Sequence, residues 1–308
     1  MTRRPPAGPI RLTDEVADAL RTGQPVVALE TSVLAQGLPV PANREAAVRM
    51  TAAVRAGGAT PALAAIVDGQ PTMGLTDAEL ERFLAREGIR KVTARDLGVC
   101  VVRGDCGATT VAATLALLPQ SGISVFATGG IGGVHREPAF DESADLVELA
   151  RTSAIVTCAG AKSILDLPAT LERLESLSVP VIGYQTDEFP AFFCRSSGLR
   201  VSARADDARQ VARFFRAHRS LGRREALLVV QPVPASAALP AGLVDDAVRD
   251  ALAAARADGV RGPSTTPYLL AAVERATGGK TLAANLALLE ANARLAAEIA
   301  VALSLPDE

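Results

Sequence analysis

The sequence predicts an α/β protein with a mixed sheet, and three observations point to this class. Short apolar segments rich in β-branched residues alternate with amphipathic helical segments from Pro25 to the end of the chain, which is typical of layered α/β proteins. The sequence Asp68-Gly69-Gln70-Pro71 separates two strand-like segments and indicates a hairpin, so at least two strands are expected to be antiparallel. Hydrophobic residues make up 49% of the 308 positions, which is enough for a large core. Because no repeat or linker-like segment divides the chain, we expect a single domain over residues 1–308.

In the first half of the chain, the expected elements begin with a short apolar strand over residues 25–30 that ends on a carboxylate. A helix is expected over 43–56, because small apolar residues recur at helical spacing and Gly57-Gly58 follows them. Thr76 and Glu79 have the spacing of a capping box, which predicts a helix over 76–87. The further elements expected here are strands over 62–67, 72–75, 91–93 and 99–102 and a helix over 109–118.

In the second half, residues 124–127 and 154–157 are predicted as buried strands, because both segments are short and apolar. Asp166 can cap the next helix, whose first turn tolerates Pro168. The remaining expected elements are helices over 143–152, 206–218, 264–276 and 281–303 and strands over 179–182 and 226–230.

Composition and charge exclude several classes of function. The net charge is -2, aromatic residues make up 3% and Trp is absent, which argues against a nucleic-acid-binding surface. The start of the chain carries charge but no apolar segment of the signal-peptide kind, and no apolar run reaches transmembrane length. The four cysteines lack the CxxC spacing of zinc sites and indicate no disulfide framework, so we expect a reducing, cytoplasmic location. These cysteines are Cys100, Cys106, Cys158 and Cys194.

The segment from Cys158 to Ser163 follows a predicted strand and carries Lys162. Lys162 is therefore expected in the crevice at the carboxyl end of the sheet, where α/β proteins usually bind ligands. A lysine beside apolar walls can lose its charge and attack a sugar or carbonyl carbon. The alternative is an ordinary surface lysine that pairs with Asp166.

The segment from Thr128 to Arg136 contains four glycines after a predicted strand. Such a loop lets backbone N–H groups approach an anion closely, and His135 and Arg136 could add donors. The segment is not a dinucleotide fingerprint, because His135 stands where the last glycine is needed. The alternative is that the glycines only allow tight packing.

Two groups of carboxylates have both a structural and a functional interpretation. The acidic residues Asp141, Glu142 and Asp145 precede or begin a predicted helix, where they could act as caps or could attract a hard divalent cation. Glu30 ends an apolar strand and could serve as a general acid, or it could be a buried glutamate paired with an arginine.

Two later segments could also reach a ligand. Residues 261–267 place hydroxyls at a helix start, which suits capping or anion binding. Asn285 and Asn292 lie two turns apart on the last helix and could bond to neighbours or to a ligand.

Taken together, these segments closely resemble the pseudouridine-5'-phosphate glycosidase family, also labelled indigoidine synthase A-like. The resemblance covers nearly the whole chain except residues 1–20, which we expect to be a peripheral segment. It rests on long strings in family order: ALETSVLAQGLP, GATPA, GATTVAATL, FATGGIGGVHR, SADLVELART, CAGAKSILDLPATLE, PVIGYQTDEFPAF, GPSTTPYLL and TLAANLALLEANARLAAEIA.

The resemblance implies a three-layer α/β/α sandwich with a mixed sheet, and typically a trimer. It implies a metal-dependent enzyme that reversibly cleaves the C–C bond between ribose C1' and uracil C5, giving uracil and ribose 5-phosphate. It also implies that Lys162 is the covalent nucleophile, that Glu30 is the proton donor and that Asp141 holds Mn²⁺ through waters. The implied substrate-binding positions are Lys91, Val111, Ser143, Ala144 and Asp145, with Thr128, His135 and Asn285 as further contacts.

The chemistry of the proposed bond agrees with this pair of residues. A C–C glycosidic bond offers no leaving oxygen to protonate, so the carboxylate-pair mechanism of O-glycosidases does not apply. Opening the ribose ring needs one acid, and capturing C1' needs one neutral amine, which Glu30 and Lys162 can supply. Two other hypotheses are a metal-independent Schiff-base lyase acting on another sugar phosphate and a non-catalytic accessory role in pigment synthesis.

Overall fold

The computed structural model describes residues 10–137, 141–260 and 265–306. Its centre is a sheet of eleven strands with the order β1-β4-β3-β2-β7-β9-β13-β11-β12, and β6 and then β5 branch from β3. These strands are β1 (Arg11–Leu12), β2 (Val26–Glu30), β3 (Thr60–Val67), β4 (Gln70–Met73), β5 (Ile89–Val92), β6 (Cys106–Thr109), β7 (Val125–Ala127), β9 (Ile155–Cys158), β11 (Val181–Tyr184), β12 (Ala203–Ala205) and β13 (Leu227–Val230). A separate antiparallel pair consists of β8 (Val134–His135) and β10 (Leu165–Asp166).

The central strands are parallel and buried. Strands β2, β7, β9, β13 and β11 pair in parallel with their neighbours, and all residues of the first four are buried. Such continuous apolar runs are typical of strands covered on both faces. Strand β3 pairs antiparallel with β4 and with β6, so the sheet is mixed and the predicted hairpin at Asp68 is confirmed.

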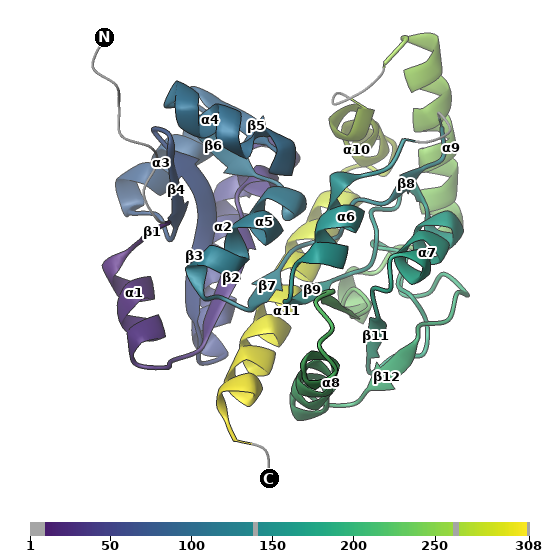
Figure 1. Ribbon diagram of the computed structural model, residues 1–308. Coiled ribbons are helices and arrows are strands. Elements are labelled where there is room, and N and C mark those ends of the chain that lie inside the picture. Colours follow the sequence, from purple (N-terminus) through teal and green to yellow (C-terminus); the bar gives the residue numbers. More distant parts are fainter. Residues whose placement is uncertain (1–9, 138–140, 261–264, 307–308) are drawn as a thin grey trace.

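Helices cover both faces of the sheet, which confirms the predicted class. The long α11 (Lys280–Ser304) packs against β2, β7 and β9 and against α2 (Ala42–Ala56) and α8 (Ala208–Ser220). On the other face, α5 (Val111–Ser121) packs against β2 and β3 and against α6 (Ala144–Arg151). Figure 1 shows α5 and α6 in front of the sheet and α11 behind it. The other helices and helical turns are α1 (Asp14–Arg21), η1 (Val33–Gly37), α3 (Asp77–Ala85), η2 (Ala94–Asp96), α4 (Leu97–Arg103), α7 (Leu167–Ser176), η3 (Ala235–Ala237), α9 (Ala241–Ala257) and α10 (Thr265–Ala276).

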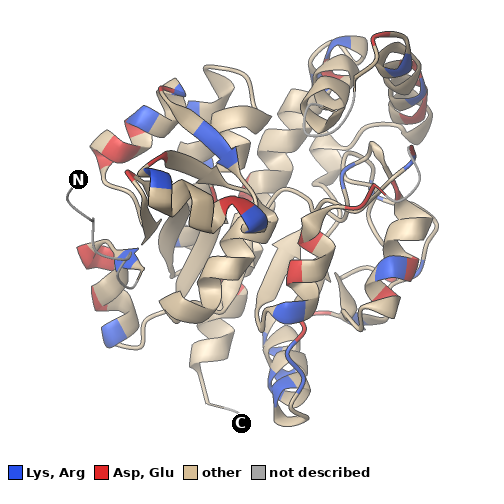
Figure 2. Ribbon diagram, turned by 45° about the horizontal axis from the view of Figure 1, so that its top comes forward, with Lys and Arg blue, Asp and Glu red and all other residues tan. Residues whose placement is uncertain are grey.

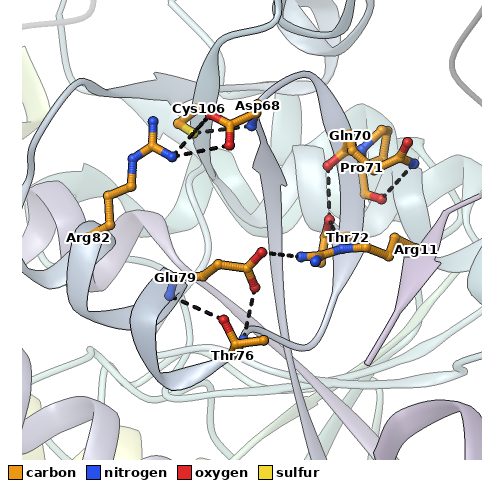
Figure 3. Close-up of polar contacts among 9 residues, drawn as sticks. All are labelled: Arg11, Asp68, Gln70, Pro71, Thr72, Thr76, Glu79, Arg82 and Cys106. Carbon is orange, nitrogen blue, oxygen red and sulfur yellow. Dashed lines mark hydrogen bonds and ion pairs between the residues drawn. The ribbon is translucent and has the colours of Figure 1, made fainter. Parts of the chain in front are cut away.

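The N-terminal residues are joined to the fold through β1 and α1. β1 pairs in parallel with β4, and α1 packs against β2 and β3. Arg11 donates to Thr72 Oγ1 at 3.3 Å and pairs with Glu79 at 2.7 Å, while Thr76 and Glu79 form the predicted capping box (Figure 3). Residues 11–20 of the segment expected to be peripheral thus belong to an edge strand and a packed helix.

One predicted element is wrong, and the helices α1 and α9 were not predicted. Residues 99–102 belong to helix α4 and not to a strand. A short apolar run cannot be assigned by hydrophobicity alone, and here Cys100 is buried while Val102 is 87% exposed, as one-sided helix packing requires. Helix α9 was not predicted, although Val244, Ala247, Val248 and Ala251 form its buried face.

Charged residues of both signs are interspersed over the outer helices in Figure 2. None of the described helices is long and apolar enough to cross a membrane.

Candidate active site

The ends of three neighbouring strands form the site. Glu30 is the last residue of β2, Thr128 follows β7, and Lys162 lies four residues beyond β9. The strand pairing continues past β7 and β9, because Ala159 N–H donates to Gly129 O at 2.9 Å and Lys162 N–H donates to Ile131 O at 3.1 Å. The carboxyl ends of parallel strands meet at one edge of a sheet, so these residues lie together.

A cavity of about 250 Å³ opens at this edge. Of the predicted site residues, Glu30, Lys91, Thr128, Lys162 and Asn285 line it. Its apolar and outer walls come from residues that were not predicted. Among these residues are Ser32, Phe192 and Phe193.

Glu30 is held by two hydroxyl groups. Glu30 is only 5% exposed. Thr128 Oγ1 donates to its Oε1 at 2.5 Å, and Ser32 Oγ donates to its Oε2 at 2.5 Å. Among the described residues no arginine pairs with this carboxyl group, so the expected structural alternative does not hold. The carboxyl group is therefore fixed in position while it faces the cavity.

Lys162 is half-buried and points into the same cavity. The turn before it requires glycine, since Gly160 has φ +87° and a Cβ there would lie 2.4 Å from Pro190 O. Asp166, the alternative ion-pair partner, instead accepts the Ala169 N–H at 2.9 Å and caps α7. Lys162 is thus placed by the backbone for contact with a ligand.

Lys91 lies on β5 at the mouth of the cavity. It keeps access to solvent, but protein atoms surround its ammonium group. This burial, with the positive charge of Lys162 as the second cause, lowers the pKa of Lys91, although Glu30 and Asp145 act in the opposite direction. The charges of Lys162 and Glu30 both act on Lys91, so these three side chains lie close together.

Asp145 joins the starts of α5 and α6 to the glycine segment. Its Oδ1 accepts the Ala112 N–H at 2.9 Å, its Oδ2 accepts the Gly132 N–H at 2.7 Å, and it is 5% exposed. Ser143 Oγ caps α6 by accepting the Asp145 N–H at 3.2 Å. A Cβ at Gly132 would lie 2.2 Å from Ser143 Oγ, so this glycine serves close packing.

Five predicted substrate-binding residues, His135 among them, do not line the cavity. Val111 and Ala144 are the first residues of α5 and α6, and Ser143 and Asp145 flank Ala144. The N–H groups at these helix starts already have acceptors, because Ala112 N–H donates to Asp145 Oδ1 and Asp145 N–H donates to Ser143 Oγ.

His135 and Asp141 are neighbours near Lys162. His135 N–H donates to Asp141 O at 2.9 Å. Burial lowers the pKa of His135, Asp141 opposes this effect, and Lys162 adds to it. A neutral imidazole can donate one hydrogen bond to a phosphate but adds no charge.

Asp141 does not belong to a protein metal cage. In the described part of the chain no group of three or more His, Cys, Asp or Glu side chains is placed to hold a metal ion. A single half-buried carboxylate suits a hard cation that keeps most of its water and binds substrate oxygen atoms.

The two asparagines of α11 differ in role. Asn285 lines the cavity. Asn292 is 1% exposed, and its Nδ2 donates to Thr128 O at 2.8 Å and Gly129 O at 3.2 Å, while its Oδ1 accepts from Gln231. Asn292 therefore positions the end of β7.

Two neighbouring features were missed from the sequence. Ser32 follows Glu30 by two residues, and this spacing of a hydroxyl after a strand-end carboxylate was a usable signal. Phe192 has φ 60°, a conformation rare for a bulky residue, and its ring packs where a Cβ of Gly130 would be. No sequence pattern indicated it. Of the expected segment 261–267, residues 261–264 lie outside the described residues, and Thr266 and Pro267 of α10 line the cavity.

Comparisons with known proteins agree on one family. Residues 15–302 match the family described as indigoidine synthase A like protein. The chain is 64% identical to pseudouridine-5'-phosphate glycosidase of Gemmatimonas aurantiaca, over 95% of this chain and 96% of that protein, and 48% identical to the protein of the same name from Dickeya dadantii, over 95% and 93%. Among solved structures, the prealnumycin C-glycosynthase AlnA in complex with ribulose 5-phosphate is 40% identical with a TM-score of 0.90, covering 97% of this chain and 98% of that one. An indigoidine synthase A-like protein from Thermotoga maritima is 36% identical with a TM-score of 0.89, covering 99% of both chains.

Proposed function

This chain belongs to the indigoidine synthase A-like family, and from that premise we propose that it is a pseudouridine-5'-phosphate glycosidase. It cleaves the C–C bond of pseudouridine 5'-phosphate reversibly, to give uracil and ribose 5-phosphate. The observation that carries the proposal is the meeting of one carboxyl group, Glu30, and one amine, Lys162, in a single cavity. The similarity to a C-glycosynthase described with a pentose phosphate supports the same class of bond and substrate.

The geometry supports a covalent route. Glu30 gives its proton to the ribose ring oxygen as the C1'–O bond breaks, and the Lys162 amine forms a new bond to C1'. The electron pair of the C1'–C5 bond then leaves with uracil, whose C5 takes a proton, and a C1'=N imine remains on Lys162. Water hydrolyses the imine, which returns the free amine and ribose 5-phosphate.

The 5-phosphate requires cationic and N–H donors. Lys91, which lines the cavity, supplies such a cation, and His135 near Lys162 could add a further donor. Asn285 is left for the uracil side, where its amide group can bond to the base.

We also propose that Asp141 holds Mn²⁺ mainly through water and substrate. Such a cation would supply charge neutralisation near the phosphate and sugar hydroxyls. From the family resemblance, a homotrimer in the cytoplasm is proposed as well.

The decisive experiment incubates the purified chain with pseudouridine 5'-phosphate and follows uracil by chromatography. We expect uracil release with Mn²⁺, strong loss in a chelator, and recovery when Mn²⁺ is restored. Release that continues unchanged in the chelator would favour a metal-independent Schiff-base lyase. Absence of uracil under every condition would refute the proposed function.

A further inference from the structure

Ser32 lines this cavity, and neither the family resemblance nor the proposed mechanism assigns it a role. We propose that its hydroxyl relays the proton from Glu30 to the substrate, an inference that rests on the glycosidase function proposed above. The observations behind it are two short hydrogen bonds, the difference in burial of the two hydroxyls, and the number of hydrogens available.

Each oxygen of the Glu30 carboxyl group has one hydroxyl partner. Ser32 Oγ lies 2.5 Å from Oε2, and Thr128 Oγ1 lies 2.5 Å from Oε1. Thr128 is 1% exposed, whereas Ser32 is half-buried, and both line the cavity. Ser32 sits at the start of the π-helical turn η1, and such turns are often found at functional sites.

The number of hydrogens on the Glu30 carboxyl group and its two hydroxyl partners decides which hydroxyl can relay the proton. A carboxylate accepts from both hydroxyls, but a proton donor must carry a hydrogen on one oxygen, and that oxygen then donates. The hydroxyl opposite it must turn and give its own hydrogen to another acceptor. For buried Thr128 the described residues offer no second hydrogen bond from Oγ1, so turning would leave a buried hydrogen unpaired. Ser32 can turn its hydrogen toward a ligand in the cavity.

The relay balances as follows. The Glu30 Oε2–H bond breaks and its proton goes to Ser32 Oγ, while the Ser32 O–H bond breaks and its proton goes to the ribose ring oxygen. The electron pair of the breaking C1'–O bond forms the new O–H bond, and the Lys162 nitrogen lone pair forms the N–C1' bond. The step ends with a Glu30 carboxylate, an intact Ser32 hydroxyl and a free hydroxyl on the opened sugar.

The test measures single-turnover formation of the Lys162 adduct, trapped with borohydride, for wild type, Ser32→Ala, Ser32→Thr and Thr128→Val. Ser32→Ala is expected to slow adduct formation by roughly 10²-fold, the low end of general-acid effects. Its KM should stay within about threefold, because a transition-state interaction is removed. Ser32→Thr keeps the hydroxyl and is expected to remain within about tenfold of wild type.

The number of protons that move in the rate-limiting step distinguishes a proton relay from a residue that only positions Glu30. In mixtures of H₂O and D₂O, the wild-type rate should depend on deuterium fraction along a curve, because two protons move in one step. Ser32→Ala should give a straight line, and Thr128→Val, which removes the matched hydroxyl on the other oxygen, should keep the curve. A curved dependence that survives in Ser32→Ala would overturn the relay. An equal loss of rate in Ser32→Ala and Thr128→Val, with a curved dependence in both, would overturn it as well. An inactive wild type would instead refute the glycosidase function.

Discussion

Lysine is rare in this chain, and its placement supports amine chemistry. The sequence contains three lysines, Lys91, Lys162 and Lys280, against 29 arginines, and the first two line the candidate active-site cavity. An amine can lose its proton and form a covalent bond, whereas a guanidinium stays protonated. The combined count of basic residues hides this signal, but a separate lysine count would have strengthened the prediction for Lys162.

Replacing the amine of Lys162 is the first prediction. Lys162→Ala and Lys162→Arg should both lose turnover by several orders of magnitude, because neither side chain can form an imine. Lys162→Ala should still bind pseudouridine 5'-phosphate, since the phosphate and base contacts lie on other residues. The measurement is uracil release, with calorimetry for binding and mass spectrometry for the borohydride-trapped peptide. Near-normal turnover in Lys162→Arg would contradict covalent catalysis.

The lowered pKa of Lys91, a residue that still reaches solvent, leads to a prediction on stability. Burial and the nearby Lys162 lower the pKa of Lys91 below its ordinary value of 10.5. Between the lowered pKa and 10.5 the unfolded chain binds more protons, so stability rises with pH across that window. Lys91→Met should therefore be more stable than wild type at pH 7, and the two should converge as pH approaches 10.5.

Denaturant titrations at several pH values measure this difference. Lys280→Met, a change at the exposed start of α11, is the control and should follow wild type. The Lys91 variant should also show a higher KM for the phosphorylated substrate, because a donor for the phosphate is lost. A Lys91 variant that is less stable than wild type at pH 7 would show that the charge is stabilising.

At the scale of elements, the sequence predicted those that carry local chemical signals. The Thr76–Glu79 spacing correctly placed the start of α3, and the Asp68-Gly69 turn correctly placed the β3–β4 hairpin, because both signals act within a few residues. Residues 99–102 were assigned wrongly because valine-rich runs favour a strand until the neighbouring contacts are known. The Ala-rich α9 lacks a strong cap and was therefore overlooked.

Helix α11 offers a test of how an element positions the site. Asn292→Ala leaves two carbonyl groups and the Gln231 amide without their partner, so it should destabilise the chain by about 1–3 kcal/mol and lower kcat by shifting Thr128 and Glu30. Asn285→Ala, two turns away on the same helix, should raise KM with little loss of stability. Thermal unfolding and steady-state kinetics separate the two. Equal effects on stability would contradict the assigned roles.

At the scale of the whole molecule, the site depends on strand order, which the sequence pattern does not reveal. Glu30, Thr128 and Lys162 come together only because β7 lies between β2 and β9, and β5 reaches the same edge through β6 and β3. The family resemblance supplied this grouping in advance. Periodicity and spacing could place each residue at a strand end, but not on neighbouring strands.

The same topology predicts an order of local opening that the four cysteines can report. All four are buried, and burial raises the pKa of Cys158 to about 12 and those of Cys100 and Cys194 to about 11. Native thiols should therefore resist alkylation at pH 8, and labelling should require local or global unfolding. Cys106 and Cys100 lie in the β5–β6–α4 branch, whereas Cys158 lies in the central strand β9.

In guanidinium below the unfolding midpoint, iodoacetamide is expected to label Cys106 and Cys100 before Cys158, as peptide mass spectrometry would show. Opening the branch breaks pairing with β3 alone, but exposing Cys158 separates β9 from both β7 and β13. Ribose 5-phosphate should slow labelling of Cys194, which follows the cavity-lining Phe193, and leave Cys106 unchanged. The fully denatured chain, in which all four thiols should react alike, is the control. Labelling of Cys158 as early as Cys106 would mean that the branch and the central sheet open as one cooperative unit.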